Sequence, residues 1–239
     1  MSRLIIVRHA QASFFDDDYD NLSELGRQQA ALLGKFWNQH GLNPSRVICG
    51  PRRRHRQTAE IAAGEIGARD AAWPEVEVRE GLDEHKLVRL LGEPFEGLQA
   101  RYPELRGLSE QHRTAASRSE KLRTFQILFE AIGKLWREAA PGTEATESWQ
   151  EYKRGVVQEI GEIVGNSEKN STVVVVTSVG GVTAVLAELV SPSDEHAFEL
   201  GWRIRNCSVT EFVFSGRKIT LDTFNSLAHL PEKQHWTFR

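Results

Sequence analysis

The sequence predicts an α/β protein: a three-layer α/β/α sandwich with a mostly parallel central sheet, an antiparallel C-terminal hairpin and a helical insertion. Short β-branched runs, which are typical of buried strands, alternate with longer segments of helical periodicity. The run from Thr172 to Val176 contains four consecutive valines, so we expect it at the centre of the sheet. Near the end of the chain, two strand patterns flank Ser215-Gly216-Arg217, a loop that favours a hairpin.

The first third of the chain is expected to form strand, helix, strand, helix and a weaker strand. Ser23 stands where a helix N-cap is expected, and Gly41 where a C-cap is expected. Pro51 ends the second strand, after which apolar residues recur at helical spacing. The expected strands are 4–7, 46–49 and 75–78, and the expected helices are 24–40 and a segment after Pro51 that includes 58–66.

From Leu82 to Thr143 the pattern changes to helical fragments broken by glycine and proline. One firm helix is expected near 119–138, where apolar residues from Leu122 to Trp136 line one face. We therefore expect a single domain, 1–239, with a helical lid inserted at about 82–143.

After the insertion the pattern predicts an amphipathic helix around 149–163, then the central strand, then a tight turn from Ser178 to Gly181. A short apolar helix, 182–190, and two final strands, 208–214 and 218–223, complete the chain. Because helices link the earlier strands, we expect those strands to be parallel and only the last pair antiparallel.

Composition limits the classes of function. The 239 residues are 40% hydrophobic and 26% charged, with a formal net charge of -3, so no overall field would recruit nucleic acid or an anionic membrane. The two cysteines, Cys49 and Cys207, lack metal-ligand spacing, which favours buried reduced thiols over a disulfide or a zinc site. The apolar stretch 4–7 is too short for a signal peptide or a membrane span. We therefore expect a cytoplasmic protein without a metal or cofactor.

Polar residues follow the predicted strands at their carboxyl ends, where sheets of this kind bind ligands. Arg8-His9 ends the first strand, the basic run 52–56 follows the second, the acidic stretch 80–85 follows the third, and Thr177-Ser178 ends the central one. We expect the first two strands to be adjacent, so that both basic clusters meet at one edge of the sheet.

These residue types suit phosphate chemistry. Arginine binds phosphate oxygens bidentately, a neutral imidazole can attack phosphorus, and a carboxylic acid can protonate the leaving alkoxide. Taken alone, the same residues have a simpler interpretation, with Arg8-His9 as a surface pair and 52–56 as the solvated start of a helix.

Several motifs occur in order along nearly the whole chain. They are Arg8-His9-Ala10, the stretch 22–30, Gly50-Pro51-Arg52-Arg53-Arg54-His55-Arg56-Gln57-Thr58-Ala59, Leu82-Asp83-Glu84 and the stretch 224–230. This set resembles the histidine phosphatase superfamily, also called the phosphoglycerate-mutase-like family, whose signature is an Arg-His-Gly strand end and a later Arg-Ala-x-Gln-Thr-Ala helix start. The resemblance implies a phosphohistidine intermediate.

The resemblance also implies roles for single residues. His9 would be the phosphorylated nucleophile, Arg8 and Arg54 the phosphate clamp, and Glu84 the proton donor. Arg54 is chosen among the arginines by its spacing to Gln57-Thr58-Ala59. The neighbouring Arg53 and Arg56 are expected to be solvated or paired.

The sequence departs from the family pattern after the central strand. The family usually has a second histidine in a Thr/Ser-His-Gly-Gly turn, whereas this turn is Thr177-Ser178-Val179-Gly180-Gly181. Ser178 or Val179 could occupy the histidine position. We favour Ser178 as a phosphate-binding residue, because one branch of the family has Thr-Ser-Gly-Gly there and shares the Gln-Ala-Ser-Phe stretch seen at 11–14.

Three further residues are candidates for the site. His55 or His85 could substitute for the missing imidazole, and Gln11 follows the nucleophile closely. His229, in a late motif of the family, is expected to be structural.

Three functions remain open from the sequence. The first is a metal-independent phosphomonoesterase acting on a phosphorylated small molecule or a phosphoprotein. The second is a weak or inactive phosphate-ligand-binding pseudophosphatase, which the missing histidine suggests. A mutase-type phosphotransferase is the third. The sequence identifies neither the substrate nor the oligomeric state.

Overall fold

The computed structural model describes residues 1–13, 20–67, 72–85, 95–138, 147–191, 193–216 and 218–238. The chain divides into two compact units. The first unit comprises 1–84 and 155–239, and the second comprises 85–154.

The first unit contains a six-stranded sheet in the order β3-β2-β4-β1-β5-β6. Its strands are β1 (Ser2–Arg8), β2 (Arg46–Cys49), β3 (Val76–Val78), β4 (Thr172–Thr177), β5 (Val209–Ser215) and β6 (Lys218–Ser226). The first four strands in this order are parallel, while β5 runs antiparallel to β1 and to β6. The predicted α/β class, the central place of the valine strand and the C-terminal hairpin are confirmed.

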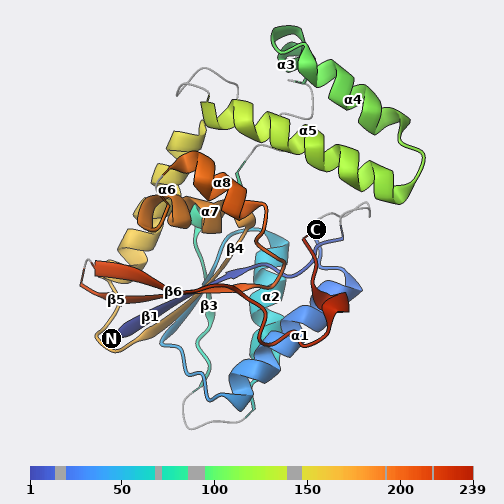
Figure 1. Cartoon of the computed structure of the whole chain (residues 1–239). Helices are drawn as coiled ribbons and strands as arrows, with labels where there is room; N and C mark the ends of the chain where they lie inside the picture. The colour runs from blue at the N-terminus through green and yellow to red at the C-terminus, as the bar shows by residue number, and fades with distance from the viewer. Residues whose placement is uncertain are drawn as a thin grey trace. The chain divides into compact units, whose positions relative to one another are not determined.

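Helices cover both faces of this sheet (Figure 1). The helices α1 (Glu24–Gln39) and α2 (Arg53–Gly64) lie on one face. The other face is covered by α7 (Val179–Leu189), α8 (Asp194–Gly201) and the part of α6 (Trp149–Gly165) that belongs to this unit. Short 3-10 turns, Glu80–Leu82 and Lys233–His235, follow β3 and precede the C-terminus.

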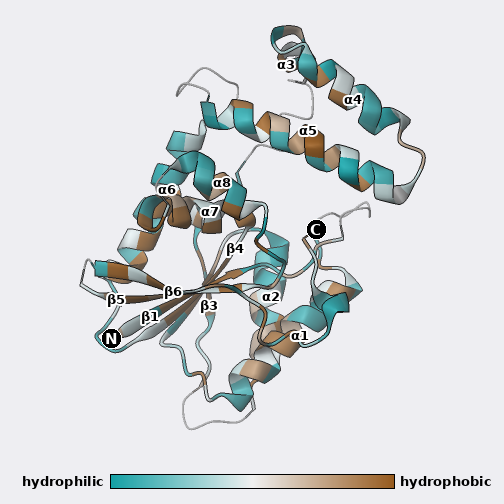
Figure 2. Cartoon of the chain, viewed as in Figure 1, coloured by the Kyte–Doolittle hydropathy of each residue, from teal (hydrophilic) through white to brown (hydrophobic). Residues whose placement is uncertain are grey.

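Both faces of the sheet are apolar because its strands alternate their side chains between the two helical layers. Ile5, Val7, Val174 and Val176 belong to the core cluster that also includes residues of α1 and α2. The intervening residues of β1 and β4 are equally buried. The hydropathy colouring shows the same arrangement, with apolar strands inside and hydrophilic helix surfaces outside (Figure 2).

Two expectations about the strand ends need correction. The strands β1 and β2 are not adjacent, because β4 pairs with both and lies between them. The valine-rich strand takes an inner position, paired with a parallel strand on each side. The predicted tight turn after β4 is also wrong: Ser178 is the N-cap of α7, and the helix begins at Val179. Gly181 serves close packing, since a Cβ there would lie 2.6 Å from Thr177 Oγ1.

Sequence patterns missed α8, although Ser193 caps it by accepting a hydrogen bond from the His196 main-chain nitrogen. In the hairpin, Gly216 adopts a φ of +57°, the left-handed conformation expected there, while Arg217 lies outside the described residues. Within the described ranges, no helix is both long and apolar enough to cross a membrane.

The second unit is helical, as the change of pattern predicts. It contains α3 (Phe95–Arg101), α4 (Glu104–Thr114), α5 (Arg118–Glu138) and the start of α6. Aromatic rings of α5 and α6 pack together in it, with Trp136 5.6 Å from Trp149 and 6.0 Å from Tyr152 between ring centroids. Its role as a lid stays a prediction.

Candidate active site

The end of β1 holds His9 in place through its main chain. The His9 nitrogen donates to the Thr177 carbonyl of β4 over 2.8 Å, and the His9 carbonyl accepts from the Cys207 nitrogen over 3.1 Å. Asn206 Nδ2 donates to the same carbonyl over 3.4 Å. Cys207 has a φ of +58°, a costly conformation for a non-glycine residue. The surrounding structure must therefore stabilise the strained main chain of Cys207, which holds the His9 carbonyl.

The His9 ring is a buried, neutral imidazole. Its Nδ1 lies 2.7 Å from the Ala10 carbonyl, which can only accept, so Nδ1 carries the proton. Arg54 Nε donates to His9 Nε2 over 3.1 Å, which places a lone pair on Nε2. Burial lowers the pKa of His9 well below its usual value, and the positive charges of Arg54 and Arg8 lower it further, as does the competition with His55 for a proton. Nε2 is therefore the unprotonated nitrogen of the ring, the form that a nucleophilic imidazole requires.

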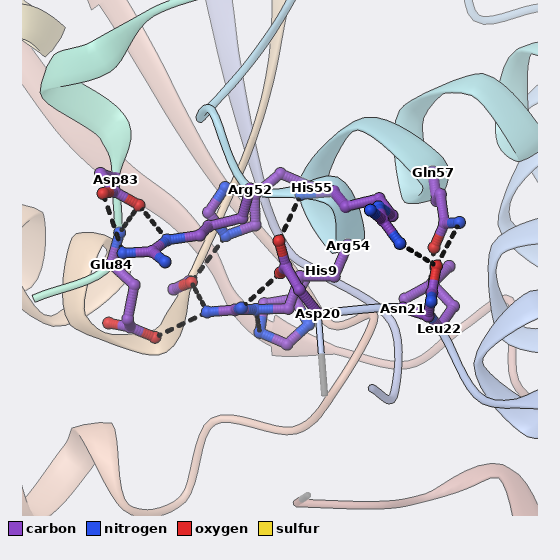
Figure 3. Close-up of polar contacts among 12 residues, drawn as sticks. His9, Asp20, Asn21, Leu22, Arg52, Arg54, His55, Gln57, Asp83 and Glu84 are labelled. Atoms are coloured by element: carbon purple, nitrogen blue, oxygen red, sulfur yellow. Dashed lines mark hydrogen bonds and ion pairs between the residues drawn. The ribbon is translucent and has the colours of Figure 1, made fainter. Parts of the chain in front are cut away.

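The guanidinium of Arg54 contacts several candidate residues at once (Figure 3). Besides His9, it donates to Asp20 Oδ1 over 2.7 Å and to Ser178 Oγ over 3.4 Å. Glu84 Oε2 forms an ion pair with it at 3.8 Å. The Arg54 side chain is only 4% exposed, so its charge acts in a site largely shielded from water.

The first turns of α2 fix Arg54 relative to β1. Thr58 Oγ1 donates to the Arg54 carbonyl over 2.7 Å and accepts from the Ala10 nitrogen over 3.0 Å. Gln57 Oε1 accepts from the Leu22 nitrogen over 2.9 Å, which ties the loop before α1 to the same helix. These contacts explain why the motif contains Gln57 and Thr58. The two side chains join the end of β1 and the loop before α1 to the helix that carries Arg54.

The start of α2 works against the helix dipole. Arg52 is the N-cap without a side-chain capping bond, and Arg53 and Arg54 begin the helix, although cations at a helix N-terminus are unfavourable. Asp20 offsets part of this cost, because its Oδ2 accepts from the Arg53 nitrogen over 2.9 Å. Such a local conflict is expected where a site needs concentrated positive charge.

Arg8 lies beside His9 and is anchored by main-chain carbonyls. Its Nη1 donates to the Ile204 carbonyl over 2.5 Å, and its Nη2 donates to the Phe238 carbonyl over 2.7 Å. The residue is 8% exposed. The C-terminal segment thus orients the guanidinium of Arg8, a contact that sequence patterns give no means of predicting.

Carboxylates surround the arginines of α2. Asp83 binds Arg52 through both oxygens, at 2.5 and 3.0 Å, and accepts from the Glu84 nitrogen over 2.7 Å. This arrangement directs Glu84 toward Arg54 (Figure 3). Asp20 is the nearer carboxylate to Arg54, and no sequence pattern distinguishes it from the other aspartates of the run 16–20.

Ser178 is brought to the site, and Val179 begins the helix after it. The Ser178 side chain is fully buried, and its Oγ lies 2.6 Å from His55 Nε2 and 3.4 Å from Arg54 Nη2. Burial, together with the charges of Arg54 and Arg52, lowers the pKa of His55 well below its usual value. His55 is therefore a second neutral imidazole beside Arg54.

Two other candidates have contacts elsewhere. Gln11 Oε1 accepts from Ser23 Oγ over 2.8 Å, at the N-terminus of α1. His85 belongs to the second unit, where its ring centroid lies 5.0 Å from that of Trp136 and 5.7 Å from that of Tyr152. Neither residue is brought to Arg54 by the contacts described for it.

The remaining expectations concern residues outside the site. Arg53 and Arg56 are exposed, as predicted. His229 is buried, which lowers its pKa to about 4. Both cysteines are buried free thiols, and burial raises the pKa of Cys49 to about 11. Among the described residues, no cluster of three or more His, Cys, Asp or Glu could hold a metal ion.

Comparison with protein families identifies the class. The profile of the histidine phosphatase superfamily (branch 1) matches residues 4–127 and 107–227, which together span most of the chain. The chain therefore belongs to the histidine phosphatase superfamily. No curated protein sequence matches it significantly.

Solved structures share the fold along nearly the whole chain. YhfR of Bacillus stearothermophilus is 20% identical, with a TM-score of 0.63, and the match covers 96% of this chain and 99% of that one. Phosphoserine phosphatase of Entamoeba histolytica, in complex with 3-phosphoglyceric acid, is 19% identical, with a TM-score of 0.64 and coverage of 96% and 100%. A mycobacterial glucosyl-3-phosphoglycerate phosphatase bound to vanadate is 22% identical, with a TM-score of 0.62 and coverage of 94% and 98%.

Proposed function

We propose that this protein is a metal-independent phosphomonoesterase that works through a phosphohistidine on His9. The observation that carries the proposal is the contact between Arg54 Nε and His9 Nε2 at 3.1 Å, on a guanidinium that also meets Glu84 and Ser178. Arg54 thus brings three groups together in one buried site: a nucleophile, a cation for the transferring phosphoryl group and a carboxyl group.

The reaction would proceed in two displacements. The Nε2 lone pair of His9 attacks phosphorus, the bond from phosphorus to the ester oxygen breaks, and a carboxyl group protonates the leaving alkoxide. Water then attacks the phosphohistidine, the carboxylate takes its proton, and the bond from phosphorus to nitrogen breaks. We assign the proton transfers to Glu84, with Asp20 as the other carboxylate on Arg54.

Two arginines would stabilise the phosphoryl group. Arg54 donates to Nε2 before attack, and the same guanidinium is placed to donate to a phosphoryl oxygen once Nε2 is bonded to phosphorus. The support for Arg8 is its position next to His9 in the chain and its charge, which lowers the pKa of His9. Ser178 Oγ would supply a further hydrogen bond to the phosphoryl group.

The substrate is proposed to be a phosphorylated small molecule. Relatives of the same fold are phosphatases of phosphoserine, of glucosyl-3-phosphoglycerate and, as a putative assignment in Escherichia coli, of α-ribazole 5'-phosphate. Their identities to this chain lie between 18 and 22%, so they support the class of substrate and leave the individual compound open. A phosphoprotein remains an alternative substrate.

The test is turnover of an aryl phosphate in the presence of a chelator. His9→Ala is expected to lower kcat at least about a thousandfold, because the covalent route is lost. His40→Ala, which changes an exposed histidine, serves as the matched control. Wild-type protein quenched during turnover should carry acid-labile, alkali-stable phosphate. Equal rates for wild type and His9→Ala would refute the proposal.

A pseudophosphatase is the second candidate, and the serine at position 178 favours it. A hydroxyl carries less positive charge than an imidazolium, so phosphoryl transfer could be slow while binding persists. This candidate predicts vanadate binding without turnover of any ester. Turnover that disappears in His9→Ala would exclude it.

A further inference from the structure

The first turn of α2 and the N-cap of α7 meet in a buried polar cluster. His55 and Ser178 are both fully buried, and His55 Nε2 lies 2.6 Å from Ser178 Oγ. Arg54 Nη2 approaches the same oxygen at 3.4 Å. The ring centroids of His55 and His9 are 5.5 Å apart. A second imidazole is therefore present beside the nucleophile, although position 178 does not supply it.

We propose that His55 is a positioning residue that fixes the Ser178 hydroxyl as a hydrogen-bond donor to the phosphoryl group, so that the two residues together replace one histidine at position 178. The proposal rests on the phosphatase function proposed above and assigns a role in it to His55.

The direction of the hydrogen bonds follows from the donor inventory. A hydroxyl has one proton and can accept two hydrogen bonds, and Arg54 can only donate to it. His55 Nδ1 is buried and forms no hydrogen bond of regular geometry among the described residues, although a main-chain contact with Gly50 acts on the ring. The shorter and better-formed contact is the one between Nε2 and Ser178 Oγ at 2.6 Å, so we assign the proton to Nε2. His55 and Arg54 then both donate to Ser178 Oγ, and its proton is directed to a third acceptor.

Space for this arrangement comes from two small residues. A Cβ on Gly50 would lie 2.4 Å from His55 Nδ1 and 2.3 Å from the Leu82 carbonyl, so a side chain there would displace the His55 ring. Ser178 is small enough to sit against that ring. A histidine at 178 would overlap it, because Ser178 Oγ already lies at hydrogen-bond distance.

The family motif Arg-Ala-x-Gln-Thr-Ala at the helix start has alanine at the position of His55. The chain thus combines an imidazole at the helix start with a hydroxyl at the strand end, in place of alanine and an imidazole. The exchange keeps the volume of the pocket nearly constant, which explains how both changes fit one close-packed site.

The test is a set of variants measured for kcat, KM and vanadate affinity. His55→Ala and Ser178→Ala are each expected to lower kcat by about 10- to 100-fold with a smaller change in KM, because the bond acts on the transferring phosphoryl group. The double variant should be no slower than the slower single variant, since the two residues act as one unit. His55→Gln, which keeps a donor near the position of Nε2, should recover most of the activity lost in His55→Ala.

The decisive pair is Ser178→His with and without His55→Ala. The double variant H55A/S178H should recover activity to within about tenfold of wild type, whereas S178H alone should stay inactive because the rings overlap. Unchanged kcat in His55→Ala, additive losses in H55A/S178A, or equal activity of S178H and H55A/S178H would overturn the proposal. His55→Gln separates a role in catalysis from a role in folding alone, because a folding role predicts recovery of stability without recovery of kcat.

Vanadate binding keeps this test distinct from the test of the proposed function. Absence of turnover in the wild type would refute the phosphatase, while vanadate affinity could still fall about tenfold in His55→Ala and return in His55→Gln. Turnover that depends on His9 and is indifferent to His55 would refute only the positioning role.

Discussion

Two helices begin at the site, and they supply different chemistry. The cap and first turn of α2 contain four arginines and His55, while the N-terminus of α7 contains Ser178 as its cap and then Val179, Gly180 and Gly181. Both helices follow strands of the same sheet, β2 and β4, which are neighbours. The positive charge of the site is therefore concentrated on one helix, and the other contributes a hydroxyl and its helix dipole.

The difference shows what each position must do. Placing arginines at a helix start is unfavourable in itself, so α2 needs Asp20 as a cap and Asp83 as a partner of Arg52. The start of α7 carries no such conflict and packs closely, with Gly181 against Thr177. Substitutions at the start of α2 should therefore weaken the stabilisation of the transferring phosphoryl group most. Substitutions at the start of α7 should weaken it less.

Removal of Arg54 should have the largest effect. Arg54→Ala is expected to lower kcat/KM by about a thousandfold or more, because one buried guanidinium contacts His9, Ser178 and two carboxylates. Arg53→Ala, which changes an exposed arginine on the same helix turn, should stay within about threefold of wild type. Steady-state kinetics on an aryl phosphate measure both. Equal effects of the two variants would show that the cluster acts only through its total charge.

The pH dependence of stability should be the next largest effect. His9 and His55 are neutral in the folded state because burial and the arginines lower their pKa values, whereas in the unfolded chain each titrates near 6.5. As pH falls below about 6.5, the unfolded state binds protons that the folded state does not, so stability falls. Each such histidine contributes up to about 1.4 kcal/mol per pH unit.

Urea unfolding at pH 7.5, 6.5 and 5.5 measures this dependence. His9→Ala and His55→Gln should each reduce the fall in unfolding free energy, because each removes one proton-binding difference. His40→Ala, which changes an exposed histidine outside the site, serves as the control for the loss of a histidine. A stability that stays constant down to pH 5.5, or that rises, would contradict the buried neutral state of both imidazoles.

The strands could be predicted because uniform β-branched runs carry a strong local signal. Their order could not, because nothing in the run from Leu4 to Val7 or in 46–49 states which strand lies beside it. The valine strand enters between β1 and β2, so the two basic clusters meet across β4. Arg54 still reaches His9, since Thr58 binds the main chain of both Ala10 and Arg54.

The candidate site was predictable where residue identity carries the chemistry. Arg54 contacts His9, Glu84 and Ser178, and the motif positions had led us to expect these residues together. The carbonyl partners of Arg8 were not predictable, because main-chain acceptors have no sequence signature. His55 was considered only as one of two substitutes for the missing imidazole, and its contact with Ser178 distinguishes it from His85.

Asp20 was missed because the acidic run 16–20 contains four aspartates with equal claims. The structure places its carboxylate 2.7 Å from Arg54 Nη1, on the guanidinium that a phosphate ester would also use. Its side chain is 34% exposed, so solvent screens part of its charge. A loop carboxylate in this position either competes with the substrate for Arg54 or holds Arg54 ready for it.

Asp20→Asn separates these roles and should give the smallest effect. The amide removes the negative charge and keeps one oxygen, so it can accept from Arg54 or from the Arg53 nitrogen, which now bind different oxygens of the carboxylate, but not from both. If Asp20 competes with the ligand, the dissociation constant of vanadate should fall by about threefold to tenfold, and less at high salt because the interaction is partly screened. Asp222→Asn, at an exposed position on β6, removes the same charge away from the site and should leave affinity unchanged. A weaker affinity in Asp20→Asn would instead show that the carboxylate holds Arg54 ready for phosphate, and the charge at the start of α2 would then depend on its acidic partners for binding as well as for stability.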